Sequence, residues 1–265
     1  PKDETGVRFS SPAPNVTEVT INLRKMTKIT NNDNIQQWSS APTSVLENFG
    51  EEGDFARQHL LNPAIFSLLG DVSGKKILDA GCGQGYLCRL LAKKGAKVTG
   101  IEPARDFIQY AISREKEENL GIDYIEKDLS EFTQPNEEFD IVVSNMVFMD
   151  IPDYQKAIHN CVQSLKKGGL FVFSISHPCF FPDAEWDKNP VVEIKEYFKE
   201  YSEKQNFGYS FHRTLSSYLN FVIEDGCEIK KLVEPKLDEE TAKLKENYSR
   251  QAHVPSFIVV CAVKK

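Results

Sequence analysis

Short apolar segments alternate with helical patterns through the middle of the chain, and this alternation constrains the fold more than any other feature. Each segment is apolar at nearly every position or every second one, which is typical of strands in α/β proteins. Such alternation predicts a mostly parallel sheet covered by helices, with ligands bound beyond the carboxyl ends of the strands. The predicted strands are 76–80, 97–101, 122–126, 139–145 and 169–175, and the predicted helices between them are 86–94, 104–119 and 154–165.

The pattern changes after residue 175. A helix is predicted over 213–224, followed by two strands over 227–233 and 257–263. Only a charged loop separates these strands, so we expect them to pair antiparallel and to close the sheet. The predicted fold class is therefore α/β, Rossmann-like and doubly wound, with a mostly parallel seven-stranded sheet, an antiparallel last strand and an insertion after the fifth strand.

The regions before the first strand are less regular. Apolar residues recur at helical spacing over 54–69, and Pro63 is placed to begin a second helix there. Residues 1–34 are polar with brief alternation, which predicts an N-terminal arm or edge strand outside the core. We therefore divide the chain into an arm, 1–34, and a single domain, 35–265.

The insertion over 176–212 is rich in aromatic residues. It holds nine of the chain's 28 Phe, Tyr and Trp residues. Such a segment at the carboxyl end of a strand is either a lid over a ligand or a satellite core, and the two interpretations are compatible. The nine residues are Phe180, Phe181, Trp186, Tyr197, Phe198, Tyr201, Phe207, Tyr209 and Phe211.

Composition narrows the classes of partner. The net charge is -7 and no long basic block is present, which argues against a nucleic-acid partner and favours a small molecule. No apolar run has the length of a membrane span and no signal-like segment opens the sequence, so we expect a cytoplasmic protein. Six cysteines without a Cys-x-x-Cys pair argue against a zinc site and a disulfide framework.

The segment ILDAGCGQGYLCRLLA, residues 77–92, places three glycines between a predicted strand and a predicted helix. A nucleotide P-loop needs Gly-Lys-Ser/Thr, whereas Tyr86 and Leu87 follow the last glycine here. A dinucleotide site needs G-x-G-x-x-G, and the third glycine here comes one residue early. The remaining candidate ligand is S-adenosylmethionine, with Asp79 orienting the loop or meeting the ligand's ammonium group.

Acidic residues follow the next two predicted strands. Glu102 ends the second strand, where a carboxylate can accept hydrogen bonds from both ribose hydroxyls. Asp128 follows the third strand, where it can accept from the adenine amine while the Leu129 N–H meets a ring nitrogen. Phe107 can cover the adenine face. Helix capping is the alternative role for both carboxylates.

These motifs together resemble those of class I S-adenosylmethionine-dependent methyltransferases. The stretches LDAGCGQGYL, GIEPARDFIQYA, KDLSEF, FDIVVSNMVFMDIPD and LKKGGLFVFSI occur in the order and spacing of that family over residues 75–175. The flanking segments resemble bacterial small-molecule enzymes of the ubiquinone/menaquinone-biosynthesis-like group. The resemblance implies S-adenosyl-L-methionine as cofactor, with contacts from Arg57, Gly81, Gly83, Gly85, Glu102, Pro103, Asp128, Asn145 and Met146.

Methyl transfer is an in-line displacement, so the protein mainly positions the acceptor and excludes water. If a general base assists, His177 and His212 are the candidates, because they lie at the two ends of the aromatic insertion. The sequence SNMV at 144–147 replaces the motif of adenine and amide methyltransferases. We expect transfer to an oxygen or nitrogen of a small aromatic or heterocyclic metabolite; the alternatives are a non-catalytic cofactor-binding regulator and an NAD-dependent oxidoreductase.

Overall fold

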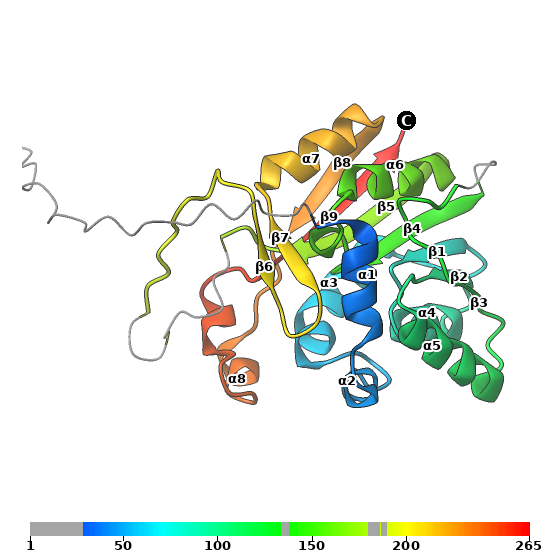
Figure 1. Cartoon of the computed structure of the whole chain (residues 1–265), viewed down its shortest axis with the longest axis horizontal. Helices are drawn as coiled ribbons and strands as arrows, with labels where there is room; N and C mark the ends of the chain where they lie inside the picture. The colour runs from blue at the N-terminus through cyan, green and yellow to red at the C-terminus, as the bar shows by residue number, and fades with distance from the viewer. Residues whose placement is uncertain (1–28, 134–137, 180–185, 187–189) are drawn as a thin grey trace, which may run out of the picture.

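The structure, a computed structural model, describes residues 29–133, 138–179, 186 and 190–265. A seven-stranded sheet with the order β3-β2-β1-β4-β5-β9-β8 forms its centre (Figure 1). Only β9 runs antiparallel to the other six strands, which confirms the predicted fold class. The strands are β1 (Lys76–Ala80), β2 (Lys97–Ile101), β3 (Asp123–Ile125), β4 (Phe139–Asn145), β5 (Leu165–Ser176), β8 (Cys227–Val233) and β9 (Phe257–Lys264).

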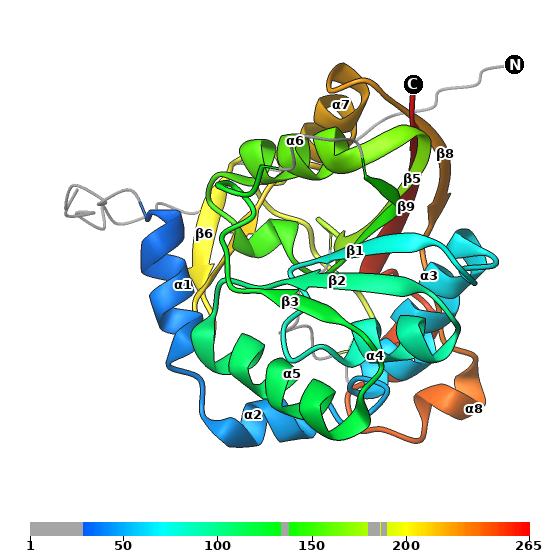
Figure 2. The ribbon, with the colours of Figure 1, turned by 90° about the vertical axis from the view of Figure 1, so that its right-hand side faces the viewer.

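Helices cover both faces of the sheet (Figure 2). On one face, α3 (Asn62–Leu69), α4 (Tyr86–Lys93) and α5 (Arg105–Glu118) bury Ile65, Leu91 and Ile108 in a core shared with Val143 of β4. On the other face, α6 (Tyr154–Ser164) and α7 (Leu215–Glu224) bury a second core around the aromatic rings of β5. Apolar side chains on both sides explain why the central strands read as nearly continuous apolar runs.

The predicted strand bounds agree closely with the observed ones. Strands 76–80, 97–101, 139–145 and 227–233 are confirmed without change. The fifth strand, predicted from residue 169, begins at Leu165 instead, because Leu165 already pairs with Phe139 ahead of a register shift. The antiparallel pairing of the last two strands is also confirmed.

The segment before β1 contains more helix than the sequence suggested. The helix α1 (Asn31–Ser39) is followed by α2 (Thr43–Asn48) and by a π turn, η1 (Arg57–Leu61), that leads into α3. Pro63 lies in the first turn of α3, as predicted. The boundary drawn at residue 34 therefore falls inside α1, while residues 1–28, with their apolar alternation, lie outside the described residues.

The insertion forms a hairpin of β6 (Tyr201–Lys204) and β7 (Tyr209–His212) that lies beside α1 (Figure 1). A side chain at Gly208 in the hairpin turn would lie only 2.6 Å from Trp38 Nε1 and 2.7 Å from Asn34 Oδ1. The turn can approach α1 this closely because it carries a glycine. We call α1 and the β6–β7 hairpin together the cover. Phe180 and Phe181 lie outside the described residues.

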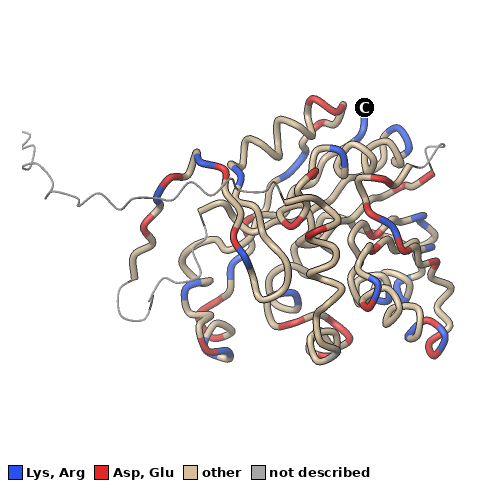
Figure 3. The backbone as a smooth tube through the Cα atoms, viewed as in Figure 1, with Lys and Arg blue, Asp and Glu red and all other residues tan. Residues whose placement is uncertain are grey.

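Short elements complete the chain, namely η2 (Phe148–Asp150) after β4, and α8 (Glu239–Ala242) with η3 (Ser249–Ala252) before β9. Acidic and basic residues are interspersed along the backbone in the view of Figure 3. The absence of a nucleic-acid partner stays a prediction. Within the described ranges, no helix combines the length and apolar character needed to cross a membrane.

Candidate functional site

The glycine loop joins β1 to α4 and is held by the end of β2. The backbone N–H groups of Gly81 and Cys82 both donate to the carbonyl oxygen of Ile101, at 2.8 and 2.9 Å. Gly81 has a φ of +79°, and a Cβ at this position would lie 2.5 Å from both methyl groups of Val147. Only glycine meets both requirements, so the loop can pass directly beneath the segment that follows β4.

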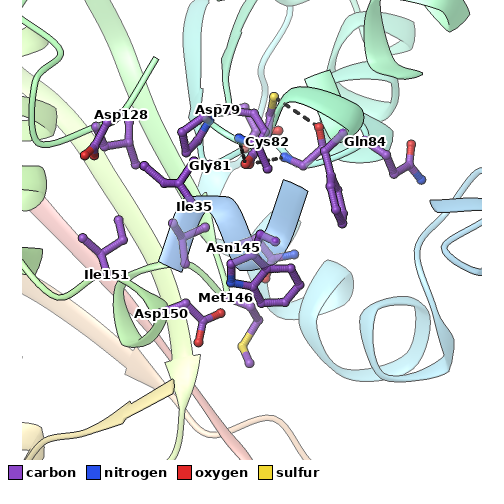
Figure 4. A pocket seen from close by; sticks show the side chains of 18 of the residues that line it. Ile35, Asp79, Gly81, Cys82, Gln84, Asp128, Asn145, Met146, Asp150 and Ile151 are labelled. Atoms are coloured by element: carbon purple, nitrogen blue, oxygen red, sulfur yellow. Dashed lines mark hydrogen bonds between the residues drawn. The ribbon is translucent and has the colours of Figure 1, made fainter. Parts of the chain in front are cut away.

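A pocket lies against this loop at the carboxyl edge of the sheet (Figure 4). It brings together every predicted cofactor residue except Gly85, which instead packs against Tyr124 and Ala111 and begins α4. The predicted residues that line the pocket are Arg57, Asp79, Gly81, Gly83, Glu102, Pro103, Phe107, Asp128, Leu129, Asn145 and Met146.

Glu102 holds the loop from the end of β2. Its two carboxyl oxygens accept hydrogen bonds from the backbone N–H groups of Gly83, at 3.0 Å, and Ala104, at 2.9 Å. Burial raises the pKa of Glu102 to about 7, although these two backbone donors oppose the shift. Each oxygen keeps a second lone pair for a hydroxyl group in the pocket.

Asp79 lies deeper, at the end of β1, and only 1% of its surface is exposed. The Cys88 thiol donates to its Oδ2 at 3.1 Å. Burial raises the pKa of Asp79 to about 7, and burial likewise raises the pKa of the Cys82 thiol to about 11. A cationic ligand group would stabilise the ionised form of Asp79.

Asp128 connects the pocket to the cover. Its Oδ2 accepts from the Asn31 side-chain amide of α1 at 3.0 Å, and its Oδ1 accepts from the Ser130 backbone N–H at 2.8 Å. Phe107, also on the pocket wall, packs edge-on against Trp38 with 6.1 Å between ring centroids. The far wall is therefore shared between the sheet and α1.

The residues after β4 form the floor. The Asn145 amide donates to the Tyr86 hydroxyl at 2.6 Å, and its carbonyl oxygen accepts from the Ser174 hydroxyl at 2.6 Å. Met146 adopts a left-handed backbone conformation with a φ of +63°, and its N–H donates to the carbonyl of Ser174 at 3.1 Å. Non-glycine residues with such strain cluster at functional sites.

A second hollow adjoins the pocket beneath the hairpin, and it contains both predicted histidines. His177 has both nitrogens engaged, since Nδ1 accepts from the Cys179 N–H at 3.1 Å and Nε2 lies 3.0 Å from Glu234 Oε1. The Nε2 of His212 lies 3.0 Å from the Tyr197 carbonyl oxygen, which requires a proton on that nitrogen. A neutral His212 therefore has Nδ1 as its acceptor.

Four side chains line both the pocket and the second hollow: Trp38, Arg57, Met146 and Asp150. Arg57 is ion-paired with Asp54 at 2.7 Å and its guanidinium lies 4.6 Å from the centroid of the Phe49 ring. These four residues form the boundary between the two spaces.

Sequence reasoning missed Trp38, Asn34 and Asp150 at this site. The helix containing the first two had a detectable signal, because Thr30 and Asp33 form a capping box at its start. Asp150 lies within the stretch FDIVVSNMVFMDIPD, which was recognised only for its strand and for Asn145 and Met146. Neither signal indicated that these residues fold over the glycine loop.

Comparison with known proteins finds methyltransferases both by sequence and by structure. Residues 78–173 match the family model described as a methyltransferase domain. A ubiquinone biosynthesis O-methyltransferase of Klebsiella pneumoniae is 32% identical over 128 residues, which are 46% of this chain and 53% of that protein. The chain thus spans about half the length of the curated relatives it matches.

Solved structures extend the similarity to most of the chain. An S-adenosylmethionine-dependent methyltransferase from Mesorhizobium loti superposes with a TM-score of 0.67 at 26% identity, covering 81% of this chain and 100% of that one. The cyclase SpnF superposes with a TM-score of 0.65 at 16% identity over 89% and 97% of the two chains, so it shares the fold alone. The matched segment, 78–173, carries a methyltransferase domain, and most of the chain shares the fold of solved S-adenosylmethionine-dependent methyltransferases.

Proposed function

We propose that this protein transfers a methyl group from S-adenosylmethionine to an oxygen or nitrogen of a small molecule held in the second hollow. The observation that carries the proposal is the shared boundary, since the pocket at the glycine loop and the second hollow have Trp38, Arg57, Met146 and Asp150 in common. A donor and an acceptor in adjoining spaces meet without crossing solvent, which is the arrangement that an in-line displacement requires.

The residues of the pocket fit the cofactor. Glu102 offers lone pairs to ribose hydroxyls, and Asp79 offers a carboxylate to the ammonium group. Phe107 and Leu129 give apolar walls for the adenine ring, with Asp128 as acceptor for its amine. A Cβ on Gly83 would meet only the Phe107 ring, at 3.7 Å, so the loop backbone is open to a ligand. When bound, the cofactor supplies an electrophilic methyl group.

The lining of the second hollow favours a ring-containing acceptor. Trp38, Tyr201, Phe211 and Tyr218 contribute aromatic rings to it, and flat rings pack well against such walls. The relatives are named O-methyltransferases of ubiquinone biosynthesis, which favours oxygen over nitrogen as the accepting atom. His212 lines the same hollow and is the better placed of the two histidines to accept a proton, because its Nδ1 is the acceptor nitrogen.

The test is transfer of radiolabelled methyl groups from S-adenosylmethionine to a small-molecule panel and to a protein-free metabolite extract. The panel contains phenols, catechols, aromatic amines and heterocyclic amines. Label in a phenol or catechol product supports the proposal. Label in no small molecule, together with tight S-adenosylhomocysteine binding by calorimetry, would instead support a non-catalytic cofactor-binding regulator. Binding of NAD in place of S-adenosylhomocysteine would support the oxidoreductase alternative.

A further inference from the structure

The carboxyl group of Asp150 occupies an unusual position between the two spaces. Of the four side chains that line both, Trp38, Arg57, Met146 and Asp150, it is the single carboxylate. In Figure 4 Asp150 and Met146 lie on the side of the pocket away from Asp79 and Gly81. The Asp150 carboxyl group therefore lies at the boundary between the two spaces.

The surroundings of Asp150 hold it in place from three elements. The Asn34 amide of α1 donates to the Asp150 backbone carbonyl. The Ser210 side chain of β7 hydrogen-bonds to the carboxyl group, and Arg57 of η1 and Arg213 act on it electrostatically. The cover and the π turn thus both interact with Asp150, and its side chain lines the two spaces.

We infer that Asp150 is the residue that accepts the proton from the methyl acceptor, which is accordingly a hydroxyl or amine that loses a proton on methylation. This inference rests on the proposed function. As the acceptor oxygen or nitrogen forms its bond to the methyl carbon, the carbon–sulfur bond breaks and its electron pair stays on sulfur. The proton released by the acceptor passes to a carboxylate oxygen of Asp150, and then to water.

The charge balance around Asp150 suits this role. Burial raises the pKa of Asp150 to about 7, while the Ser210 hydrogen bond, Arg57 and Arg213 oppose the shift. A carboxyl group with such a pKa is ionised in part at neutral pH and accepts a proton more readily than an ordinary aspartate. The imidazoles of His177 and His212 line the same hollow.

The position of Asp150 can be tested with the cofactor analogue sinefungin, and this test does not require the methyl acceptor to be known. In this analogue a carbon bearing a protonated amine replaces the sulfonium and its methyl group, whereas S-adenosylhomocysteine has neither. Calorimetry at pH 8 compares both ligands in the wild type, Asp150→Asn and Asp153→Asn. Asp153 is the matched control, because its side chain is exposed and it lies three residues further on in the same segment.

In Asp150→Asn we expect sinefungin affinity to fall about tenfold, the loss of one charge-assisted hydrogen bond, while S-adenosylhomocysteine affinity changes less than twofold. In Asp153→Asn both affinities stay within twofold. An unchanged ratio of the two affinities in Asp150→Asn overturns the inference alone. Failure of the wild type to bind either ligand overturns the proposed function.

The wild type provides a second measurement that does not depend on a folded variant. Its preference for sinefungin should fall several-fold between pH 8 and pH 6, as Asp150 becomes protonated through a pKa of about 7. If protonation of Asp150 causes this change, the preference for sinefungin should fall by the same factor in His212→Gln. A preference that is constant from pH 8 to pH 6 overturns the inference, as does a fall that disappears in His212→Gln.

Discussion

The glycine-loop half of the site and the cover are held by different kinds of interaction. The loop is anchored by backbone hydrogen bonds to β2, and its flanking strands carry fully buried side chains such as Leu78 and Ile101. The cover meets the rest of the site through a few side chains, chiefly Asn31, which bonds to Asp128, and Asn34, which bonds to the Asp150 carbonyl. One half is therefore a rigid part of the core, whereas the other is held by a small number of side-chain hydrogen bonds and is expected to open more readily.

The largest effect is expected from Gly81→Ala, which changes the glycine loop. The new methyl group would clash with Val147, and alanine would have to adopt the left-handed conformation of Gly81. We therefore expect the free energy of unfolding to fall by roughly 2–5 kcal/mol. Urea denaturation measures this loss, and calorimetry should show S-adenosylhomocysteine binding weakened more than tenfold.

Gly121→Ala is the matched control for this change. Its φ is +76°, but a Cβ there meets nothing within 4 Å. Only the conformational cost of about 1–2 kcal/mol then applies, with ligand affinity unchanged. Equal losses in both variants would contradict the predicted clash, and adding Val147→Ala should partly rescue Gly81→Ala.

Glu102→Gln is expected to weaken S-adenosylhomocysteine binding by about tenfold to a hundredfold, with a smaller effect on stability. The amide replaces one acceptor oxygen by a donor, which opposes the N–H groups of Gly83 and Ala104 and removes an acceptor for ribose hydroxyls. Calorimetry measures the affinity. Glu131→Gln, at an exposed position outside the pocket, is the control and should bind normally.

The stability of the glycine-loop half should also depend on pH through Glu102. Because the pKa of Glu102 is raised from 4.5 to about 7 in the folded protein, its stabilising contribution is fully present below pH 4.5 and is lost as the pH rises through 7. The difference in unfolding free energy, wild type minus Glu102→Gln, should therefore be larger at pH 5 than at pH 8. Urea denaturation at the two values checks the sign, and a larger difference at pH 8 contradicts the assignment.

Asn34→Ala tests the cover. The variant loses the hydrogen bonds with Tyr209, at 2.6 and 3.0 Å, and the bond to the Asp150 carbonyl. We expect amide hydrogen exchange to accelerate about tenfold or more over 201–212, the equivalent of one to two lost hydrogen bonds, with no change in β1. Ser40→Ala, at the exposed end of α1, should change neither region. Equal acceleration in β1 would show that the cover is part of the rigid core.

The smallest effect is expected from His177→Gln. Both ring nitrogens contact other groups of the protein, namely the Cys179 N–H and Glu234. Neither nitrogen is therefore available to accept a proton from a substrate. Labelled methyl transfer to a panel acceptor should stay within about threefold of the wild type, the effect of one exposed ion pair. A loss above tenfold with unchanged thermal stability would restore His177 as a catalytic candidate.

Residues near strand ends were the most predictable part of the site. Glu102 and Asp79 follow buried strands whose periodicity is unambiguous, and parallel strands bring their carboxyl ends to one edge. His177 and His212 were chosen because they lie at the two ends of the aromatic insertion, and both line the second hollow. Their partners come from residues 234 and 197, which no local pattern connects to them. Gly85 was grouped with the loop glycines, whereas its contacts are with Tyr124 and Ala111.

Strand periodicity and loop chemistry are local properties, so they were enough to predict the sheet, the glycine loop and the acidic residues around it. The tertiary structure was needed to show that α1 lies against the pocket, that the β6–β7 hairpin lies against the second hollow, and that Asp150 faces both spaces. The physical reason is that the cover depends on contacts between residues far apart in the chain, such as the 175-residue separation of Asn34 and Tyr209. Such contacts leave no periodic trace in either segment.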